Sequence, residues 1–255
     1  MQSIICVIDC ESTIKPQPMQ HSKPHSAQSP VKAVLFDLDD TLWHLAPTLV
    51  RAEAILYDWL NIHIPGVTQR FTNEELRELR MELLPTDPQF QFNVWALRHA
   101  ALTRACHLTS ENKELVDQAM EVFSVARNAV NPFDDVVPVL SSLNERYALG
   151  SVSNGFADLA EIGLAPHFKV SIAAHQFGSA KPGAEIFHAA CAALAVEPHE
   201  AIYVGDDPKL DIQGAQNAGL RAVWMNRFGH TLPDHIVPDA SCTNLYELDA
   251  WLHPR

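Results

Sequence analysis

The 255-residue chain has few cysteines and no long apolar run. Its five cysteines form no Cys-x-x-Cys pair, and an odd number fits a disulfide framework poorly. No apolar stretch approaches the roughly 18 residues that cross a bilayer. The apolar start of the chain lacks the basic segment that precedes a secretory signal. These absences predict a reduced, cytoplasmic protein that has no membrane partner.

The chain also has few basic residues. Lys and Arg number 18 against 31 Asp and Glu, which gives a formal net charge of −13 at neutral pH. Such a surface argues against nucleic-acid binding, which relies on basic patches. The 13 histidines form no His-Glu-x-x-His motif and no cluster with cysteine, so a zinc site is not expected. An anionic substrate would need local positive charge or a bound metal.

Three kinds of segment follow one another along the chain. Residues 1–30 include a stretch with four prolines and few large apolar side chains, which predicts a flexible leader. From residue 31, strand and helix patterns alternate, as in a Rossmann-like, doubly wound parallel sheet of the α/β class. The alternation is interrupted by residues 45–130, which have helical patterns throughout. We therefore expect an α/β core of residues 31–44 and 131–255 that carries an all-helical cap of residues 45–130.

Helix boundaries are suggested by local signals. In the cap, Pro47 opens the first helix, the capping box at residues 72–75 opens the second, and Ser110 is a candidate N-cap for a helix over 111–129. A further cap helix is expected at about 90–106. In the core, the patterns predict strands at 33–36, 148–152, 169–173, 201–204 and 221–225, and helices at about 134–146, from 156, 182–195, 209–218 and 244–252.

Two carboxylates and a threonine follow the first predicted strand. Asp37, Asp39 and Thr41 stand two residues apart, directly behind the apolar run at 33–36. Open α/β sheets bind ligands at the carboxyl ends of their strands, so these side chains are expected at such a site. One carboxylate can attack phosphorus, while its neighbour protonates the leaving oxygen and later deprotonates water.

Three more polar groups occur where a strand ends or a helix begins. Ser153, Asn154 and Gly155 follow the second core strand and offer donors for phosphoryl oxygens. Lys181 precedes a predicted helix, where its ammonium group can balance carboxylates and hold phosphate. The turn at 205–211 carries three acids after a buried strand, a donor set that suits magnesium. Each group alone also fits a solvated turn or a helix cap, and Asp207 in particular can act as a cap.

The order of the four groups is similar to the motif order of the haloacid dehalogenase-like hydrolase superfamily. The resemblance covers about residues 33–229 and extends to the first subclass, which carries a helical cap between the first two motifs. It implies that Asp37 is the nucleophile and Asp39 the general acid and base, with Lys181 bridging phosphoryl group and nucleophile. It also implies phosphate binding by Thr41, Ser153, Asn154, Gly155 and Lys181, and Mg²⁺ binding by Asp37, the Asp39 carbonyl, Asp206 and Asp211.

The resemblance implies phosphate-ester chemistry, because the dehalogenating members lack an acid at the position of Asp39. The sequence around the motifs is similar to a branch with flavin mononucleotide and ribitylaminouracil-phosphate phosphatases and pyrimidine nucleotidases. The expected activity is magnesium-dependent hydrolysis of a small phosphate ester, such as flavin mononucleotide, a nucleotide or a sugar phosphate, through an aspartyl-phosphate. A sugar phosphomutase and a non-catalytic binding protein are the alternatives, and the oligomeric state is left open between monomer and homodimer.

Substrate selectivity is expected to come from the cap. Residues 88–99 bring together Phe90, Phe92 and Trp95, which could stack on a planar ring. Arg98 or His99 in the same stretch could meet a second anionic group on the substrate. The alternative is that these aromatics pack the core of the cap.

Overall fold

The computed structural model describes residues 30–253, so the predicted leader lies outside the described residues except for Pro30. In this part of the chain, six strands form one sheet in the order β3-β2-β1-β4-β5-β6, and every neighbouring pair is parallel. This confirms the predicted α/β fold with its parallel sheet. The strands are β1 Ala33–Phe36, β2 Ala148–Ser153, β3 Val170–Ala173, β4 Ala201–Gly205, β5 Arg221–Met225 and β6 Ala240–Cys242.

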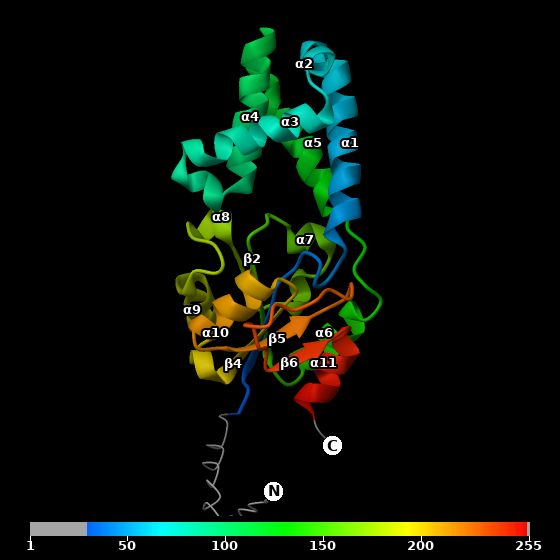
Figure 1. The fold of residues 1–255 in the computed structure, drawn as a ribbon. Helices are drawn as coiled ribbons and strands as arrows, with labels where there is room; N and C mark the ends of the chain where they lie inside the picture. Colours follow the sequence, from blue (N-terminus) through cyan, green and yellow to red (C-terminus); the bar gives the residue numbers. More distant parts are fainter. Residues whose placement is uncertain (1–29, 254–255) are drawn as a thin grey trace, which may run out of the picture.

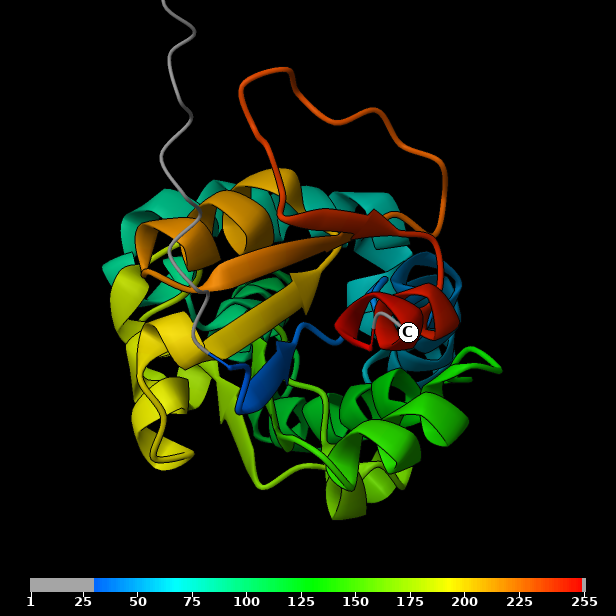
Figure 2. The same cartoon turned by 90° about the horizontal axis from the view of Figure 1, so that it is seen from below.

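Helices cover both faces of the sheet (Figures 1 and 2). Alternate residues of β1 explain this arrangement, because successive side chains of a strand point to opposite faces. Val34 and Phe36 pack with α6 and α11, whereas Ala33 and Leu35 pack with α9 and α10. The core helices are α6 Val136–Asn144, α7 Leu159–Ile162, α8 Ala174–Phe177, α9 Ala184–Ala193, α10 Gly214–Asn217 and α11 Leu245–Leu252. Both faces being buried accounts for the uninterrupted apolar runs of the central strands.

A helical region between β1 and β2 stands above the carboxyl ends of the strands in Figure 1. It has its own hydrophobic cluster, which includes Leu56, Leu79, Leu102 and Phe123. Its helices are α1 Leu45–His63, α2 Pro65–Arg70, α3 Asn73–Leu83, α4 Val94–Thr109 and α5 Val116–Asn128. An inserted helical region is thus present, whereas the exact division at residues 44 and 130 stays a prediction.

Several helix boundaries differ from the sequence-based expectation. Ser110 does not cap the following helix; it ends α4 in the left-handed region with φ 57°, and the Asn112 side chain instead caps a short turn before α5. Pro182 does not open a helix, because α9 begins only at Ala184. The helix expected from residue 156 is the short α7, which Asp158 caps. Strand β6 and helix α8 were not predicted because both are very short.

Short helical turns connect these elements within the described residues. Five 3₁₀ turns occupy Leu84–Thr86, Pro88–Gln91, Lys113–Leu115, Ala165–His167 and Pro198–Glu200, and a π-helical turn spans Pro208–Gln213 ahead of α10. The capping box predicted at Thr72 and Glu75 is present, with both reciprocal hydrogen bonds. Within residues 30–253, none of the helices combines the length and apolar character that a membrane span requires.

Candidate active site

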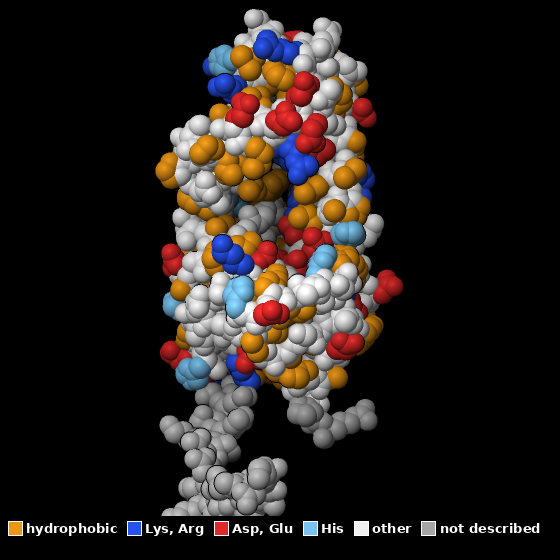
Figure 3. Space-filling model, viewed as in Figure 1, with side chains coloured by type: hydrophobic (Ala, Val, Ile, Leu, Met, Phe, Trp, Pro, Cys, Tyr) orange, Lys and Arg blue, Asp and Glu red, His pale blue; other side chains and the backbone are white. Residues whose placement is uncertain are grey.

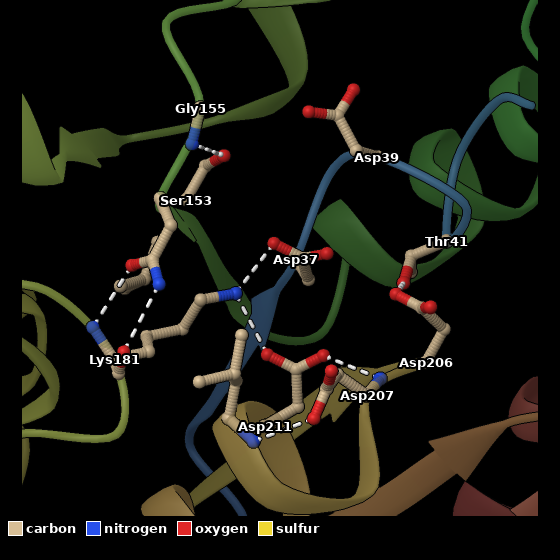
Figure 4. Close-up of polar contacts among 12 residues, drawn as sticks. Asp37, Asp39, Thr41, Ser153, Gly155, Lys181, Asp206, Asp207 and Asp211 are labelled. Atoms are coloured by element: carbon tan, nitrogen blue, oxygen red, sulfur yellow. Dashed lines mark hydrogen bonds and ion pairs between the residues drawn. The ribbon is translucent and has the colours of Figure 1, made fainter. Parts of the chain in front are cut away.

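The predicted site residues converge at the carboxyl ends of three adjacent strands. Strand β1 lies between β2 and β4, with Phe36 in register with Ser151 on one side and Val204 on the other. The residues that follow, Asp37 after β1 and Asp206 after β4, therefore emerge side by side, next to Ser153 at the end of β2. This convergence explains how motifs more than 100 residues apart in sequence form one site (Figure 4).

Lys181 is the centre of the cluster. Its Nζ donates to Asp37 Oδ1 at 2.6 Å, to Asp211 Oδ1 at 2.7 Å and to the Tyr203 hydroxyl at 2.9 Å. Burial alone would lower the pKa of Lys181, but the carboxylates of Asp211 and Asp37 outweigh it and raise the pKa well above its usual value. Lys181 is therefore a fixed positive charge beside the predicted nucleophile.

The loop that carries Lys181 is held by Asn154. The Asn154 side chain donates to the Lys181 carbonyl at 3.0 Å and accepts from the Lys181 N–H at 2.9 Å. The neighbouring Ser153 hydroxyl accepts from the Gly155 N–H at 3.0 Å. Asn154 thus fixes the backbone of the lysine, while Ser153 and Gly155 line the cavity on the core side.

The acidic turn after β4 is built around Asp211, which is 1% exposed. Its Oδ1 contacts Lys181, and its Oδ2 accepts from the Asp207 N–H at 2.9 Å. Asp207 caps the following turn by accepting from the N–H groups of residues 209 and 210. Gly205 allows this close approach, because a Cβ at that position would lie 2.4 Å from the Asp211 carboxyl group.

Asp37, Asp206 and Asp211 form a group that could hold a metal ion. One carboxylate oxygen from each lies within 4.8 Å of the others. Burial, with the charges of Asp211 and Asp40, raises the pKa of Asp206 to about 7. Burial also raises the pKa of Asp37 well above its usual value, although Lys181 opposes the shift. Lys181 pairs with Asp37 and Asp211, so the three carboxylates, when ionised, carry more negative charge than its one ammonium group balances. A divalent cation would neutralise this excess. This all-oxygen donor set fits magnesium.

Asp39 takes a different direction from Asp37. Figure 4 shows its carboxylate turned away from the cluster around Lys181. Arg127 Nη2 contacts both of its oxygens, and Trp43 Nε1 donates to its Oδ1 at 2.8 Å. Thr41 is fully buried, with its hydroxyl 3.4 Å from Asp206 Oδ1. The predicted acid and base is thus tied to α5, the last helix of the inserted region.

A cavity of about 430 Å³ lies between the inserted helices and the sheet. Its core side carries the acidic cluster, Ser153 and Lys181, whereas its opposite side carries mainly apolar residues with Arg80 and Arg98. None of the three aromatics predicted to contact the substrate belongs to this lining. Phe90 is buried, Phe92 packs against the hydrophobic cluster of the α/β core, and Trp95 stacks on His99. Among residues 88–99, the cavity is lined by Val94, Leu97 and Arg98.

Three contributors to the site escaped the sequence analysis. Tyr203 lies in β4, where its hydroxyl contacts Lys181 and donates to the Val152 carbonyl at 2.8 Å. Arg127 and Arg80 line the cavity and belong to inserted helices whose polar residues gave no motif. The sequence offered one indication for Tyr203: it places a polar hydroxyl in a strand that is otherwise apolar and buried, where such a group needs a hydrogen-bond partner.

Comparisons with known proteins agree with this architecture. The family model described as haloacid dehalogenase-like hydrolase matches residues 31–219. The chain is 28% identical to 5-amino-6-(5-phospho-D-ribitylamino)uracil phosphatase YigB of Escherichia coli, over 76% of this chain and 83% of YigB. It is 32% identical to glyceraldehyde 3-phosphate phosphatase of Methanopyrus kandleri, over 77% and 84%.

Among solved structures, a 2-haloacid dehalogenase from Pseudomonas syringae pv. tomato superposes with a TM-score of 0.83 and 39% identity. The match covers 87% of this chain and 98% of that protein. The chain therefore belongs to the haloacid dehalogenase-like hydrolase family, as its four motifs predicted.

Proposed function

We propose that this protein is a magnesium-dependent phosphatase that hydrolyses a small phosphate monoester through an aspartyl-phosphate at Asp37. The observation that carries the proposal is the contact of Lys181 with both Asp37 and Asp211, beside a carboxylate group able to hold a metal. That the chain is a phosphoric monoester hydrolase of its family agrees with the prediction from sequence. Beyond this class of activity, we propose the dependence on magnesium, the roles of the individual residues and the aspartyl-phosphate intermediate.

The contacts of Asp37 support its role as nucleophile. One Asp37 oxygen, Oδ1, contacts Lys181, which leaves the other free to attack phosphorus. The bond from phosphorus to the leaving oxygen breaks as that oxygen takes a proton from Asp39. Asp39 then deprotonates a water molecule that attacks the same phosphorus, so that inorganic phosphate leaves and the Asp37 carboxylate is restored.

Other residues bind and orient the phosphoryl group. Ser153, Gly155 and Lys181 offer hydrogen-bond donors at the edge of the cavity, and Asn154 holds the lysine loop. Mg²⁺ would be held by the carboxylates of Asp37 and Asp206 and by the Asp39 carbonyl. Asp211 would support the ion through water or through its neighbours, because both of its oxygens already accept hydrogen bonds. The ion, when bound, would neutralise phosphoryl charge and orient it.

The substrate is a small phosphorylated metabolite. A cavity of about 430 Å³ has room for a nucleotide, flavin or sugar phosphate rather than a macromolecule. Residues 45–130 act as a cap that closes over the site, excludes water and supplies selectivity. Relatives named as 5-amino-6-(5-phospho-D-ribitylamino)uracil phosphatase, glyceraldehyde 3-phosphate phosphatase and pyrimidine 5'-nucleotidase support this class of substrate.

Dehalogenation is the second candidate, because a 39% identical structure is described as a 2-haloacid dehalogenase. Asp39 favours phosphate chemistry: its carboxyl group, when protonated, supplies the proton that an alkoxide leaving group needs and a halide does not. The two candidates differ in the product they release.

The test is the release of phosphate from a panel of esters, with magnesium and with EDTA. The panel holds flavin mononucleotide, nucleoside monophosphates, sugar phosphates and phosphoserine. Chloride release from 2-chloropropionate is measured alongside. We expect metal-dependent phosphate release that Asp37→Asn abolishes. Chloride release without phosphate release would establish dehalogenation, and phosphoryl transfer between two positions of a sugar would establish a mutase.

A further inference from the structure

A second charged cluster lies on the inserted-helix side of the cavity, away from the acidic site. Arg80 Nη2 and Arg98 Nη2 both donate to one oxygen of Glu53, Oε1, at 2.9 and 2.8 Å. Two guanidinium groups therefore share one carboxylate, which leaves one net positive charge. Both arginines line the cavity. Figure 3 shows the hollow between the two lobes, with basic side chains at its upper right rim just below a group of acidic ones, and further acidic side chains at its lower right edge.

Arg98 is fixed and incompletely paired. It is 8% exposed, and its guanidinium carbon lies 3.7 Å from the ring centroid of Phe123. Its Nη1 is buried and has no acceptor among the described residues. A buried donor without a partner is costly, and a buried charge that lacks full compensation is more so. Burial and the nearby Arg80 lower the pKa of Arg98 to about 10, so the side chain remains charged at neutral pH.

We propose that Arg98, supported by Arg80 and Phe123, binds a second anionic group of the substrate, a carboxylate or a second phosphate remote from the ester that is cleaved. Guanidinium groups recognise both kinds of oxyanion with paired hydrogen bonds. Because Arg98 lines the cavity and Glu53 balances only one of the two arginines, an oxyanion bound there supplies the second negative charge that the cluster lacks.

This inference rests on the proposed function and narrows its substrate class. The cavity has two poles: Lys181 and the metal-binding carboxylates on the core side, and the net positive arginine cluster opposite. A phosphate ester whose other end is neutral would leave the arginine cluster without an anionic partner. An ester with a second anionic group would bind at both ends of the cavity, which fixes its orientation.

Binding to the Asp37→Asn variant decides the inference without turnover. Dissociation constants are measured in magnesium for three matched pairs of phosphate esters. The first two pairs, 3-phosphoglycerate against glycerol 3-phosphate and 6-phosphogluconate against sorbitol 6-phosphate, differ in a carboxylate at short and long spacing. The third, fructose 1,6-bisphosphate against fructose 6-phosphate, differs in a second phosphate. We expect the acidic member to bind about tenfold more tightly in at least one pair, as a charged hydrogen bond provides.

The same ratios are then measured with Arg98→Met and Arg98→Lys added to Asp37→Asn. Methionine keeps apolar contact with Phe123 but removes the charge, so the preference should fall to about twofold or less. Lysine should retain part of it. Arg70→Met, on the surface of the inserted region and outside the cavity lining, should retain the full ratio.

A ratio within each pair cancels any general loss of folding or affinity. The inference is overturned if no pair shows a preference above twofold, or if the preference survives Arg98→Met. Phosphate release by the wild-type protein tests the phosphatase function separately. A protein that releases phosphate but shows no preference for the second anionic group would contradict the role of Arg98 alone.

Discussion

Arg127 Nη2 lies 2.6 Å from Oδ1 and 2.7 Å from Oδ2 of Asp39, although 88 residues separate the two in sequence. The arginine side chain is 2% exposed and belongs to the last turn of α5. The contact joins the inserted helices directly to the proposed acid and base. The position of α5 therefore determines where the Asp39 carboxylate points.

Replacing Arg127 should impair the proton transfers assigned to Asp39. For Arg127→Met we expect kcat to fall about tenfold to hundredfold on alkyl phosphates. This is less than the roughly 10²- to 10⁴-fold that acid–base catalysis contributes, because Asp39 itself remains. The loss should be smaller on p-nitrophenyl phosphate, whose leaving group needs no proton. Steady-state kinetics on both substrates, with Arg70→Met as the control, measure the difference. Equal losses on the two substrates would assign Arg127 a purely structural role.

Removing Lys181 should destabilise the protein as well as inactivate it. Lys181→Met leaves Asp37 and Asp211 in a buried site without their ammonium partner. Breaking a buried ion pair from one side costs about 3–5 kcal/mol. Urea unfolding in EDTA measures the change in the free energy of unfolding. Lys169→Met removes a lysine from outside this cluster and serves as the control; a similar loss in both variants would contradict the central role of Lys181.

The strands and their polar ends could be predicted because their signals are local. Asp37, Ser153 and Asp206 each follow an apolar run, and parallel strands bring such ends together. The pairs Arg127–Asp39 and Arg98–Glu53 could not be predicted. They depend on how inserted helices pack on one another and on the sheet, which no motif encodes. Ser110 shows the same limit at short range: its side chain suits a helix start, but its backbone ends the preceding helix.

Magnesium should raise the thermal stability of the wild-type protein. An ion that binds the folded state alone stabilises it by about 2.7 kcal/mol when present at 100 times its Kd. Asp206→Asn removes one of the three grouped carboxylates, so its midpoint should rise less on adding magnesium. Thermal unfolding with increasing magnesium, after EDTA treatment, measures both effects. Asp234→Asn, which lies outside the group, should behave as wild type; an equal response in Asp206→Asn would exclude that carboxylate as a ligand.

The ion-pair cluster around Glu53 predicts a dependence of stability on pH. Burial raises the pKa of Glu53, but Arg98 and Arg80 outweigh it, so the pKa lies below its usual value of 4.5. Because the folded state binds the proton more weakly than the unfolded state, the stabilisation is present above pH 4.5 and is lost as pH falls through the lowered pKa. Glu53→Gln should therefore be less stable than wild type at pH 7. The gap in the free energy of unfolding between the two proteins should shrink as the pH is lowered.

Denaturant unfolding of both proteins between pH 7 and pH 3 gives the gap at each pH. Glu78→Gln is the control, because Glu78 is exposed on α3 and belongs to no ion pair in the described part of the chain. A gap that stays constant across this range would mean that the Glu53 side chain stabilises the inserted helices through its packing. A gap that closes at low pH would show that its charge does so, by compensating two arginines that otherwise repel each other.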